Sequence, residues 1–393
     1  MSLQEQVGGA LGKPAIPAAL EDTSIAHVDE RSSDERFYYA TQWQLIRWRF
    51  QRHRLAMISL ILLVALYLTA AFAEFASPYT AQERFDGYQQ SPPTKIHFSD
   101  EGGFQRPFIY GRTKVLDKKT FKYIFTEDPN QKVPIRFFVQ GTEYKLWGLG
   151  KPKLHLFGTN ETTPLLLFGA DELGRDIFSR TIYGSRISLS IGLVGVALSF
   201  LIGVTLGGIS GYFGGAVDEV IQRIIDFIIS IPAIPFWLAL AAALPRDLSV
   251  TKTYFFITII LSLISWPGLA RVVRGKLLAL REEDYALAAQ AAGASEGRII
   301  FRHLLPGFTS HLIVSLTLAV PGSILGETAL SYLGLGMQPP AVSWGVLLRD
   351  AQDLVAIAQQ PWRLIPALFV ITAVLLFNFV GDGLRDAADP YSN

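Results

Sequence analysis

The residues of this chain that could do chemistry do not assemble a recognised catalytic motif. Glycine–lysine pairs begin at Gly12, Gly150 and Gly275, but all three lack the upstream glycine and the following hydroxyl residue of a phosphate-binding loop. No His-Glu-x-x-His occurs, and His303 and His311 are eight residues apart, which is poor spacing for a shared metal ion. We therefore expect no catalytic or metal site, and any uphill transport must be driven by a partner or an ion gradient.

The composition is that of a membrane protein. Half of the 393 residues are hydrophobic, only 18% are charged, and the mean hydropathy is +0.30. A net charge of +1 gives no basic excess, so no nucleic-acid partner is expected. The absence of cysteine excludes disulfides, thiol catalysis and thiolate metal sites.

Five or six apolar runs are long enough to cross a bilayer, which takes about 20 apolar residues per helix. The third run is the least regular, because Arg223 and Asp226 lie near its start and Pro232 and Pro235 interrupt it. Proline is tolerated in membrane helices where neighbouring helices satisfy the freed carbonyl groups. We expect an all-α polytopic membrane protein with spans at Leu55–Ala76, Ile187–Gly211, Val220–Leu244, Thr253–Val272, Leu312–Leu335 and Leu364–Val380.

Basic residues orient these spans. Four arginines crowd the start of the first span, which places the N-terminus in the cytoplasm by the positive-inside rule. They are Arg47, Arg49, Arg52 and Arg54. Counting six spans from there puts the loop Arg271–His303 and the C-terminus inside as well. That loop is itself rich in lysine and arginine, so the two inferences agree.

The chain divides into four parts. Residues 1–40 are polar and lack periodicity, so a disordered cytoplasmic tail is expected there. Residues 41–77 hold the first span and a basic amphipathic segment, which either lies as an elbow on the membrane face or simply extends the span. Residues 78–167 form an external insertion. Residues 168–393 form the membrane core, which includes the cytoplasmic loop 271–306.

Alternating runs in the external insertion predict a small, partly β region whose strands are joined by turns. The runs are Phe121–Phe125, Val133–Val139, Tyr144–Leu149 and Lys153–Phe157. Two interpretations of the insertion stay open. It is either a docking or lid surface for an external partner, or a packed cap without a direct role.

The cytoplasmic loop predicts two short helices. Residues 286–292 are mostly alanine, a strong helix former of little bulk, so this helix could lie very close to another surface. Gly293 can end it, because glycine readily adopts the left-handed conformation found after helices. A second helix is expected to start near Ser295 and to end at Pro306. Its apolar face would consist of Ile299, Ile300 and Leu304.

Two such helices joined at a glycine would form a rigid knob outside the bilayer. Charged residues on the knob are available for ion pairs with a partner. They are Glu282, Glu283, Arg298 and Arg302. The alternative is an ordinary cytoplasmic loop that is amphipathic by chance.

The loop resembles the cytoplasmic coupling loop of ABC-importer permeases. It matches the family pattern at Ala288, Ala289, Gly293, Leu305 and Pro306. It departs at Leu287, where the general motif has glutamate, and at Gly307, where asparagine often follows the proline. His303 before Leu-Leu-Pro is similar to the variant of the oligopeptide/dipeptide importers.

Other segments resemble the same subfamily in the same order, and together they cover nearly everything from Phe168 onward. They are Phe168–Asp176 with Ser179–Arg180 and Tyr183–Arg186, Gly211–Gly215 with Asp218, Leu330–Gly336, Ser343–Gly345, and Gly381–Asp386 with Asp389–Pro390. The chain thus resembles the C-type permease of oligopeptide/dipeptide ABC importers. Its long external insertion resembles the Yej-type branch, whose members take up peptides and peptide-like antibiotics.

The resemblance implies a type I importer permease fold with six transmembrane helices, with the partly β insertion between helices 1 and 2. It implies a bacterial inner-membrane complex with a homologous permease as a heterodimer, two ATP-binding subunits and a periplasmic substrate-binding protein. ATP and Mg²⁺ would be bound by the ATP-binding subunits, and this chain would hold no cofactor. Transport would proceed by alternating access. The rival hypotheses are a secondary transporter driven by an ion gradient, and a membrane enzyme or structural anchor.

The resemblance also assigns roles to residues. ATPase coupling falls to Glu282, Glu283, Tyr285, Ala288, Ala289, Gly293, Arg298, His303, Leu305 and Pro306. Gly174, Arg175 and Asp176 belong to an external family motif. Ionisable residues in or near spans are functional candidates, so Glu327 and Asp226 are assigned to the translocation path or a gate. The alternative for Glu327 is a buried, hydrogen-bonded structural role.

Overall fold

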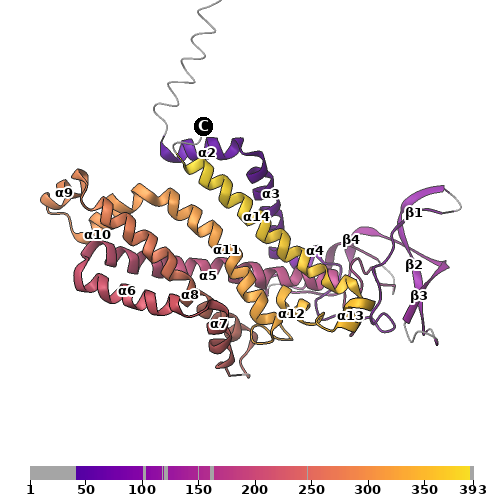
Figure 1. Ribbon diagram of the computed structural model, residues 1–393. Helices are drawn as coiled ribbons and strands as arrows, with labels where there is room; N and C mark the ends of the chain where they lie inside the picture. Colours follow the sequence, from indigo (N-terminus) through magenta and orange to yellow (C-terminus); the bar gives the residue numbers. More distant parts are fainter. Residues whose placement is uncertain are drawn as a thin grey trace, which may run out of the picture.

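The computed structural model describes residues 41–100, 103–116, 118, 123–148, 150–159, 163–245 and 247–389. The tail predicted for residues 1–40 lies outside the described residues. The described chain is an elongated bundle of helices (Figure 1). A small β region lies at one end of the bundle and a pair of short helices lies at the other, so the predicted insertion and the predicted loop are far apart.

Five helical segments of the described chain are long and apolar enough to cross a membrane. They are α3 (Arg54–Ala71), α5 (Ile177–Phe213), α8 (Val250–Leu280), the run Glu296–Tyr332 that ends in α11 (Thr309–Tyr332), and the run Pro361–Ala388 that contains α14 (Ile365–Ala388). Every predicted span except the third overlaps one of these segments. Short helices complete the external end, namely α4 (Ala73–Ala76), α12 (Trp344–Arg349), α13 (Leu354–Gln359) and η4 (Pro361–Leu364).

The third predicted span is a bent pair of helices instead of one straight helix. α6 (Gly215–Ser230) and α7 (Ala233–Ala242) meet at an angle of 88°. Pro232 cannot donate a helical hydrogen bond, and Ile231 before it is extended, with φ −91° and ψ 127°. Counted as one broken span, the pair brings the total to six.

The segment before the first span is a separate helix. α2 (Gln42–Arg52) ends at His53, whose extended backbone breaks the chain direction before α3 begins. Ile46 and Phe50 are buried in a cluster shared with α14, while other aromatic residues of α2 are exposed. The amphipathic helix is therefore present. Its place on the membrane face stays a prediction.

The external insertion contains two small antiparallel sheets. The first has the order β1 (His97–Asp100), β2 (Gly103–Leu116) and β3 (Tyr123–Pro134), and the second pairs β4 (Arg136–Gln140) with β5 (Leu154–Gly158). Of the predicted runs, Lys153–Phe157 corresponds to β5. The described part of Phe121–Phe125 opens β3.

The other strand predictions need correction. The run Val133–Val139 spans the end of β3 and most of β4, which are separated at Ile135. The prediction of a strand at Tyr144–Leu149 is wrong, because the described residues of this run form a loop. This loop is held by side-chain bonds, since the Tyr144 hydroxyl donates to the Leu154 carbonyl at 2.7 Å. The long strand β2 was not predicted at all.

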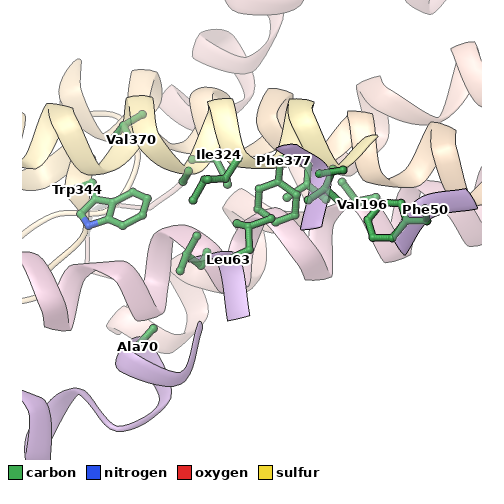
Figure 2. Close-up of a cluster of buried hydrophobic side chains, with 14 of the residues drawn as sticks. Phe50, Leu63, Ala70, Val196, Ile324, Trp344, Val370 and Phe377 are labelled. Carbon is green, nitrogen blue, oxygen red and sulfur yellow. The ribbon is translucent and has the colours of Figure 1, made fainter. Parts of the chain in front are cut away.

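An apolar cluster joins α3, α5, α11 and α14 along the bundle (Figure 2). Each of the four helices contributes buried side chains, among them Leu63 of α3, Val196 of α5, Ile324 of α11 and Phe377 of α14. Trp344 from α12 closes the external end of the cluster, and its indole nitrogen donates to the Thr181 carbonyl at 3.1 Å. Inside a bilayer such side chains would be apolar in lipid as well, so close van der Waals packing, and not removal from water, holds these four helices together.

A glycine stripe on α5 brings this helix against α8. A Cβ atom on Gly207 would lie 2.4 Å from the Ala270 carbonyl oxygen, and one on Gly211 would lie 2.8 Å from that of Arg274. Only glycine permits so close an approach of the two backbones. α5 and α8 are therefore packed as one unit.

Candidate functional site

The two short helices at the end of the bundle are α9 (Asp284–Ala291) and α10 (Glu296–Arg298). Gly293 between them has φ +77°, a conformation that glycine adopts without steric cost. Its amide donates to the Gln290 carbonyl at 2.9 Å, and the next amide donates to Ala289 at 3.1 Å. The predicted helix, glycine turn and second helix are confirmed. We call residues 282–308 the knob.

The inner face of the knob is apolar and buried. Its buried side chains are Ala286, Ile299, Ile300, Leu304 and Phe308. They form a cluster with Val204 of α5, with Val273 and Leu277 of α8, and with Leu312 of α11. The predicted apolar face of the second helix is confirmed. This packing fixes the knob to three membrane spans.

The outer face of the knob is exposed and partly apolar. Tyr285 is 44% exposed, Leu287 is 49% exposed and Phe301 is 62% exposed. Ala288 is also exposed, while Ala289 is half-buried. Exposed apolar residues gathered on a charged loop are typical of a protein contact surface.

Charged groups surround this outer face. The Arg281 guanidinium lies 3.7 Å from a Glu282 carboxylate oxygen and donates to the Tyr212 carbonyl at 3.1 Å, which links the knob to the end of α5. Of the four charged residues predicted to pair with a partner, three are exposed and form no ion pair with any described residue. They are Glu283, Arg298 and Arg302. Glu282 is instead paired with Arg281, and the contact of these residues with a partner stays a prediction.

The predicted end of the second helix at Pro306 is wrong. α10 continues as a π-helical turn, η2 (Ile299–Leu304), then as a 3-10 turn, η3 (Leu305–Phe308), and then as α11. Pro306 is accommodated because it lies in the first positions of the 3-10 turn, where its missing N–H breaks no regular helical ladder. His303 and Leu305 are half-buried in these turns. The second helix is thus the beginning of the fifth span.

Residues Gly293–Gly297 have the pattern Gly-x-Ser-x-Gly of a hydrolase nucleophile elbow, so the prediction that the chain contains no catalytic motif was wrong for this pattern. In a hydrolase the serine follows a strand and is activated by a histidine. Here Ser295 follows α9, is exposed, and forms no hydrogen bond with a histidine among the described residues. The spacing therefore does not form a catalytic site.

The external family motif lies in a network of buried charges. One Asp171 carboxylate oxygen accepts from Arg175 Nε at 2.7 Å and from Arg180 Nη1 at 2.5 Å. Arg180 is 2% exposed and also lies 3.4 Å from Asp350. Arg363, 5% exposed, binds the Asp350 backbone oxygen. The network ties the start of α5 to the segment from α12 to α14. The ion pair of Arg180 with Asp350, and the hydrogen bond of Arg363 to the Asp350 backbone, were not predicted from the sequence.

The other two residues of the motif have structural positions. Gly174 has φ +74°, and a Cβ atom there would lie 2.6 Å from the Phe85 carbonyl oxygen. Asp176 caps α5, because its carboxylate accepts from the Ser179 amide at 2.8 Å and from the Ser179 hydroxyl at 2.7 Å. Burial raises the pKa of Asp176 to about 7, although the hydrogen bonds from Ser179 oppose this shift.

The two candidates for the translocation path lie apart from the knob and in different settings. Glu327 of α11 is fully buried, and its two oxygens accept from the Ser188 hydroxyl at 2.9 Å and from the Ser331 hydroxyl at 2.8 Å. Asp226 of α6 is exposed and pairs with Arg271 of α8. They share no partner in the described chain, and their assignment to the path stays a prediction.

Two of the pockets among the described residues do not contain the two candidates for the translocation path. One of about 200 Å³ is partly open and is lined by α5, α8 and α11, with three serines among its residues, namely Ser199, Ser265 and Ser315. Another of about 400 Å³ lies between the α7–α8 connection and residues 334–340, beside Arg349. Glu327 and Asp226 line neither cavity. The described residues also contain no group of three histidine, aspartate or glutamate side chains placed to hold a metal ion.

Two protein families match the chain. Residues 203–391 match the family described as "Binding-protein-dependent transport system inner membrane component". Residues 41–93 match the "N-terminal TM domain of oligopeptide transport permease C". Two solved structures of the MetNI methionine ABC transporter in inward-facing conformations also align, at 19% and 18% identity and with a TM-score of 0.40 each. They cover 53% and 54% of this chain and 96% and 97% of those chains.

Curated relatives align over more than half of the chain. The oligopeptide transport permease OppC of Bacillus subtilis is 44% identical over 224 residues, which cover 57% of this chain and 71% of that protein. The dipeptide transport permease DppC of the same organism is 42% identical, with 57% and 68% covered. A putative peptide permease of Brucella ovis is 41% identical over 250 residues, with 63% and 81% covered. The chain therefore belongs to the inner-membrane components of binding-protein-dependent transport systems, and within them to the OppC/DppC-like permeases, which are transport subunits and not enzymes.

Proposed function

We propose that this chain is the permease subunit of an ATP-driven, binding-protein-dependent importer of peptides or peptide-like compounds. Its relatives carry the names of oligopeptide and dipeptide transport permeases. In this proposal the chain pairs with a homologous permease. Two ATP-binding subunits, which bind ATP and Mg²⁺, and a periplasmic substrate-binding protein complete the transporter.

The observation that carries the proposal is the two-faced knob. Its inner face is packed against α5, α8 and α11 through the apolar cluster that contains Leu304. Its outer face presents exposed alanine, Tyr285, Leu287 and Phe301 to a partner. A knob that is fixed to three spans and exposed to a partner can transmit the movement of that partner to the spans.

Alternating access follows from this arrangement. ATP binding favours the closed state of the ATP-binding subunits, and this differential affinity biases the transporter between two conformations. Closure would displace the knob, and α5 and α8 would move together because the Gly207 and Gly211 contacts hold them as one unit. The family residues of the knob, from Glu282 to Pro306, are therefore proposed as the ATPase-coupling loop.

The orientation of the chain is part of the proposal. The arginines of α2 and of the knob region favour the cytoplasm for both segments. Arg49 of α2 donates to the backbone oxygen of Asp389 at 2.6 Å, so the two ends of the described chain lie side by side (Figure 1). These observations support the proposal that both termini lie in the cytoplasm and the β insertion in the periplasm.

The proposal is tested by adding bulk to the outer face of the knob. Replacing the exposed Ala288 with tryptophan should leave the fold of the chain intact but prevent close seating in a groove of the ATP-binding subunit. A lost contact of 1.4 kcal/mol or more lowers affinity by at least about tenfold. We therefore expect the Ala288→Trp transporter to lose substrate-stimulated ATPase activity and peptide uptake together.

The matched control places the same side chain on the external sheet. Thr126 of β3 is exposed, so Thr126→Trp should insert, assemble and transport as the unaltered chain does. Normal coupled activity of Ala288→Trp would contradict the coupling role. Uptake that persists without any ATP-binding partner would favour transport driven by an ion gradient.

A further inference from the structure

Three exposed aromatic side chains gather on one part of the external insertion. Phe137 and Phe138 of β4 are 68% and 63% exposed, and Trp147 in the loop between β4 and β5 is 61% exposed. We call these three residues the aromatic patch. A group of exposed aromatic side chains marks an interaction surface, whereas a single one is ordinary on a surface in water.

The aromatic patch is attached to the outer end of the first span. The Trp147 indole nitrogen donates to the carbonyl oxygen of Ala71, the last residue of α3, at 2.9 Å. The Trp147 ring lies 5.3 Å from the ring of Phe72, and the Phe138 ring lies 6.4 Å from that of Phe75. These contacts fix the height of Trp147 and Phe138 relative to the membrane span, and Phe137 is the chain neighbour of Phe138.

That height corresponds to the bilayer surface. α3 has 18 residues. At 1.5 Å per residue such a helix is about 27 Å long, close to the roughly 30 Å of a hydrocarbon core. Ala71 therefore lies at the boundary between hydrocarbon and headgroups. α3 also exposes apolar side chains along its length, such as Ile61 and Leu68, as expected for a helix that contacts lipid.

The backbone of the patch is held in an unusual conformation. Phe138 has φ +56° and Trp147 has φ +50°, and among the described residues Gln90 is the only other non-glycine residue in this region. Bulky residues rarely adopt positive φ. Such conformations persist only where the surrounding structure holds them, and they are frequent at functional sites. In both residues the side chain is held toward the end of the first span.

Basic residues border the aromatic patch. Arg136, Lys145 and Lys151 are exposed and form no ion pair with a described residue. Glu143, the acidic residue of this loop, is paired with Lys153 at 3.0 Å. Aromatic rings at headgroup height beside unpaired basic residues are typical of surfaces that bind anionic lipid.

We propose that the aromatic patch and its basic border bind the outer surface of the lipid bilayer, with anionic headgroups as the ligand. The patch anchors β4 and β5 beside the outer end of the first span. The three-stranded sheet, which projects beyond β4 in Figure 1, remains in water.

The absence of cysteine allows a direct measurement of depth. A nitroxide is attached at Phe137→Cys in one chain and at Lys145→Cys in another. The Lys145→Cys variant keeps all three aromatic side chains. The matched control is Phe104→Cys, a phenylalanine of β2 that is 86% exposed. Each labelled chain is assembled with cysteine-free partner subunits in vesicles of phosphatidylethanolamine and phosphatidylglycerol. Power-saturation EPR then compares access by oxygen with access by a water-soluble nickel chelate.

We expect the label at position 137 to be severalfold less accessible to the nickel chelate than the label at 104, and more accessible to oxygen. The label at 145 should fall between them, at headgroup height. Equal nickel access at 137 and 104 would overturn the proposal, because the patch would then lie in water. Low access to both reagents with an immobilised spectrum would also overturn it, because a protein subunit would then cover the patch.

Discussion

At the knob, short helices are attached to three spans by apolar side chains such as Ile300 and Leu304. At the external end, the start of α5 is attached to the segment after α11 by the buried charges of Asp171 and Arg180. Apolar contacts have no preferred direction, so packed elements can shift slightly against each other without losing their stabilisation. Buried ion pairs require fixed geometry and are costly to break. Apolar packing therefore suits the knob, which in our proposal receives movement from a partner. Buried ion pairs suit the opposite end, which must keep its shape.

The largest effect is expected from breaking the external charge network. Asp171→Asn leaves the buried Arg180 with only the more distant Asp350, and an uncompensated buried charge costs about 3–5 kcal/mol. The purified permease should therefore show a clearly lower apparent melting temperature in detergent. Asp226→Asn is the control, because its ion pair with Arg271 is exposed and such pairs contribute about 1 kcal/mol or less. Equal losses in the two variants would show that burial does not distinguish the two ion pairs.

A smaller but informative difference is expected between the two faces of the knob. Leu304→Ala removes a fully buried side chain and should cost about 2–5 kcal/mol of stability. Phe301→Ala removes a side chain that is 62% exposed, so stability should change by no more than about 0.5 kcal/mol. Melting temperature and substrate-stimulated ATPase activity are measured for both variants. Phe301→Ala should retain its melting temperature and lose coupling; the opposite result would reverse the assignment of the two faces.

The membrane spans could be predicted because burial in lipid leaves long apolar runs in the sequence. Their ends could not be predicted equally well. α5 begins at Ile177, ten residues before the predicted Ile187, because its first turns carry polar residues such as Arg180 that pack inside the protein. A hydropathy pattern identifies residues in contact with lipid. It does not detect polar turns that extend a helix beyond the membrane.

The knob was predictable in outline because alanine, glycine and apolar spacing are local signals. The error at Pro306 arose because a proline usually ends a helix, whereas here a π turn and a 3-10 turn absorb it. β2 was missed because Arg112 and Lys114 interrupt its apolar alternation. Arg112 instead bonds to the Pro92 carbonyl at 2.8 Å and to the Thr94 hydroxyl at 2.6 Å.

The pairs that join the two halves of the external charge network could not be predicted, because their members are far apart in the sequence. Arg180 and Asp350 are 170 residues apart, and Arg363 lies 191 residues from its partner Glu172. Each appears in the sequence as an ordinary charged residue near the end of a helix. Their pairing follows from how α5 and the segment from α12 to α14 meet, which no local pattern encodes.

The contact between the knob and an ATP-binding subunit can be tested most directly by photocrosslinking. Benzoylphenylalanine is placed at Leu287 on the outer face, and at Phe104 on the external sheet as the control. In the assembled, active transporter, we predict that illumination joins the chain to an ATP-binding subunit from position 287 and not from position 104. No such crosslink from position 287, in a transporter that still couples ATP hydrolysis to uptake, would contradict the assignment of the knob as the coupling site.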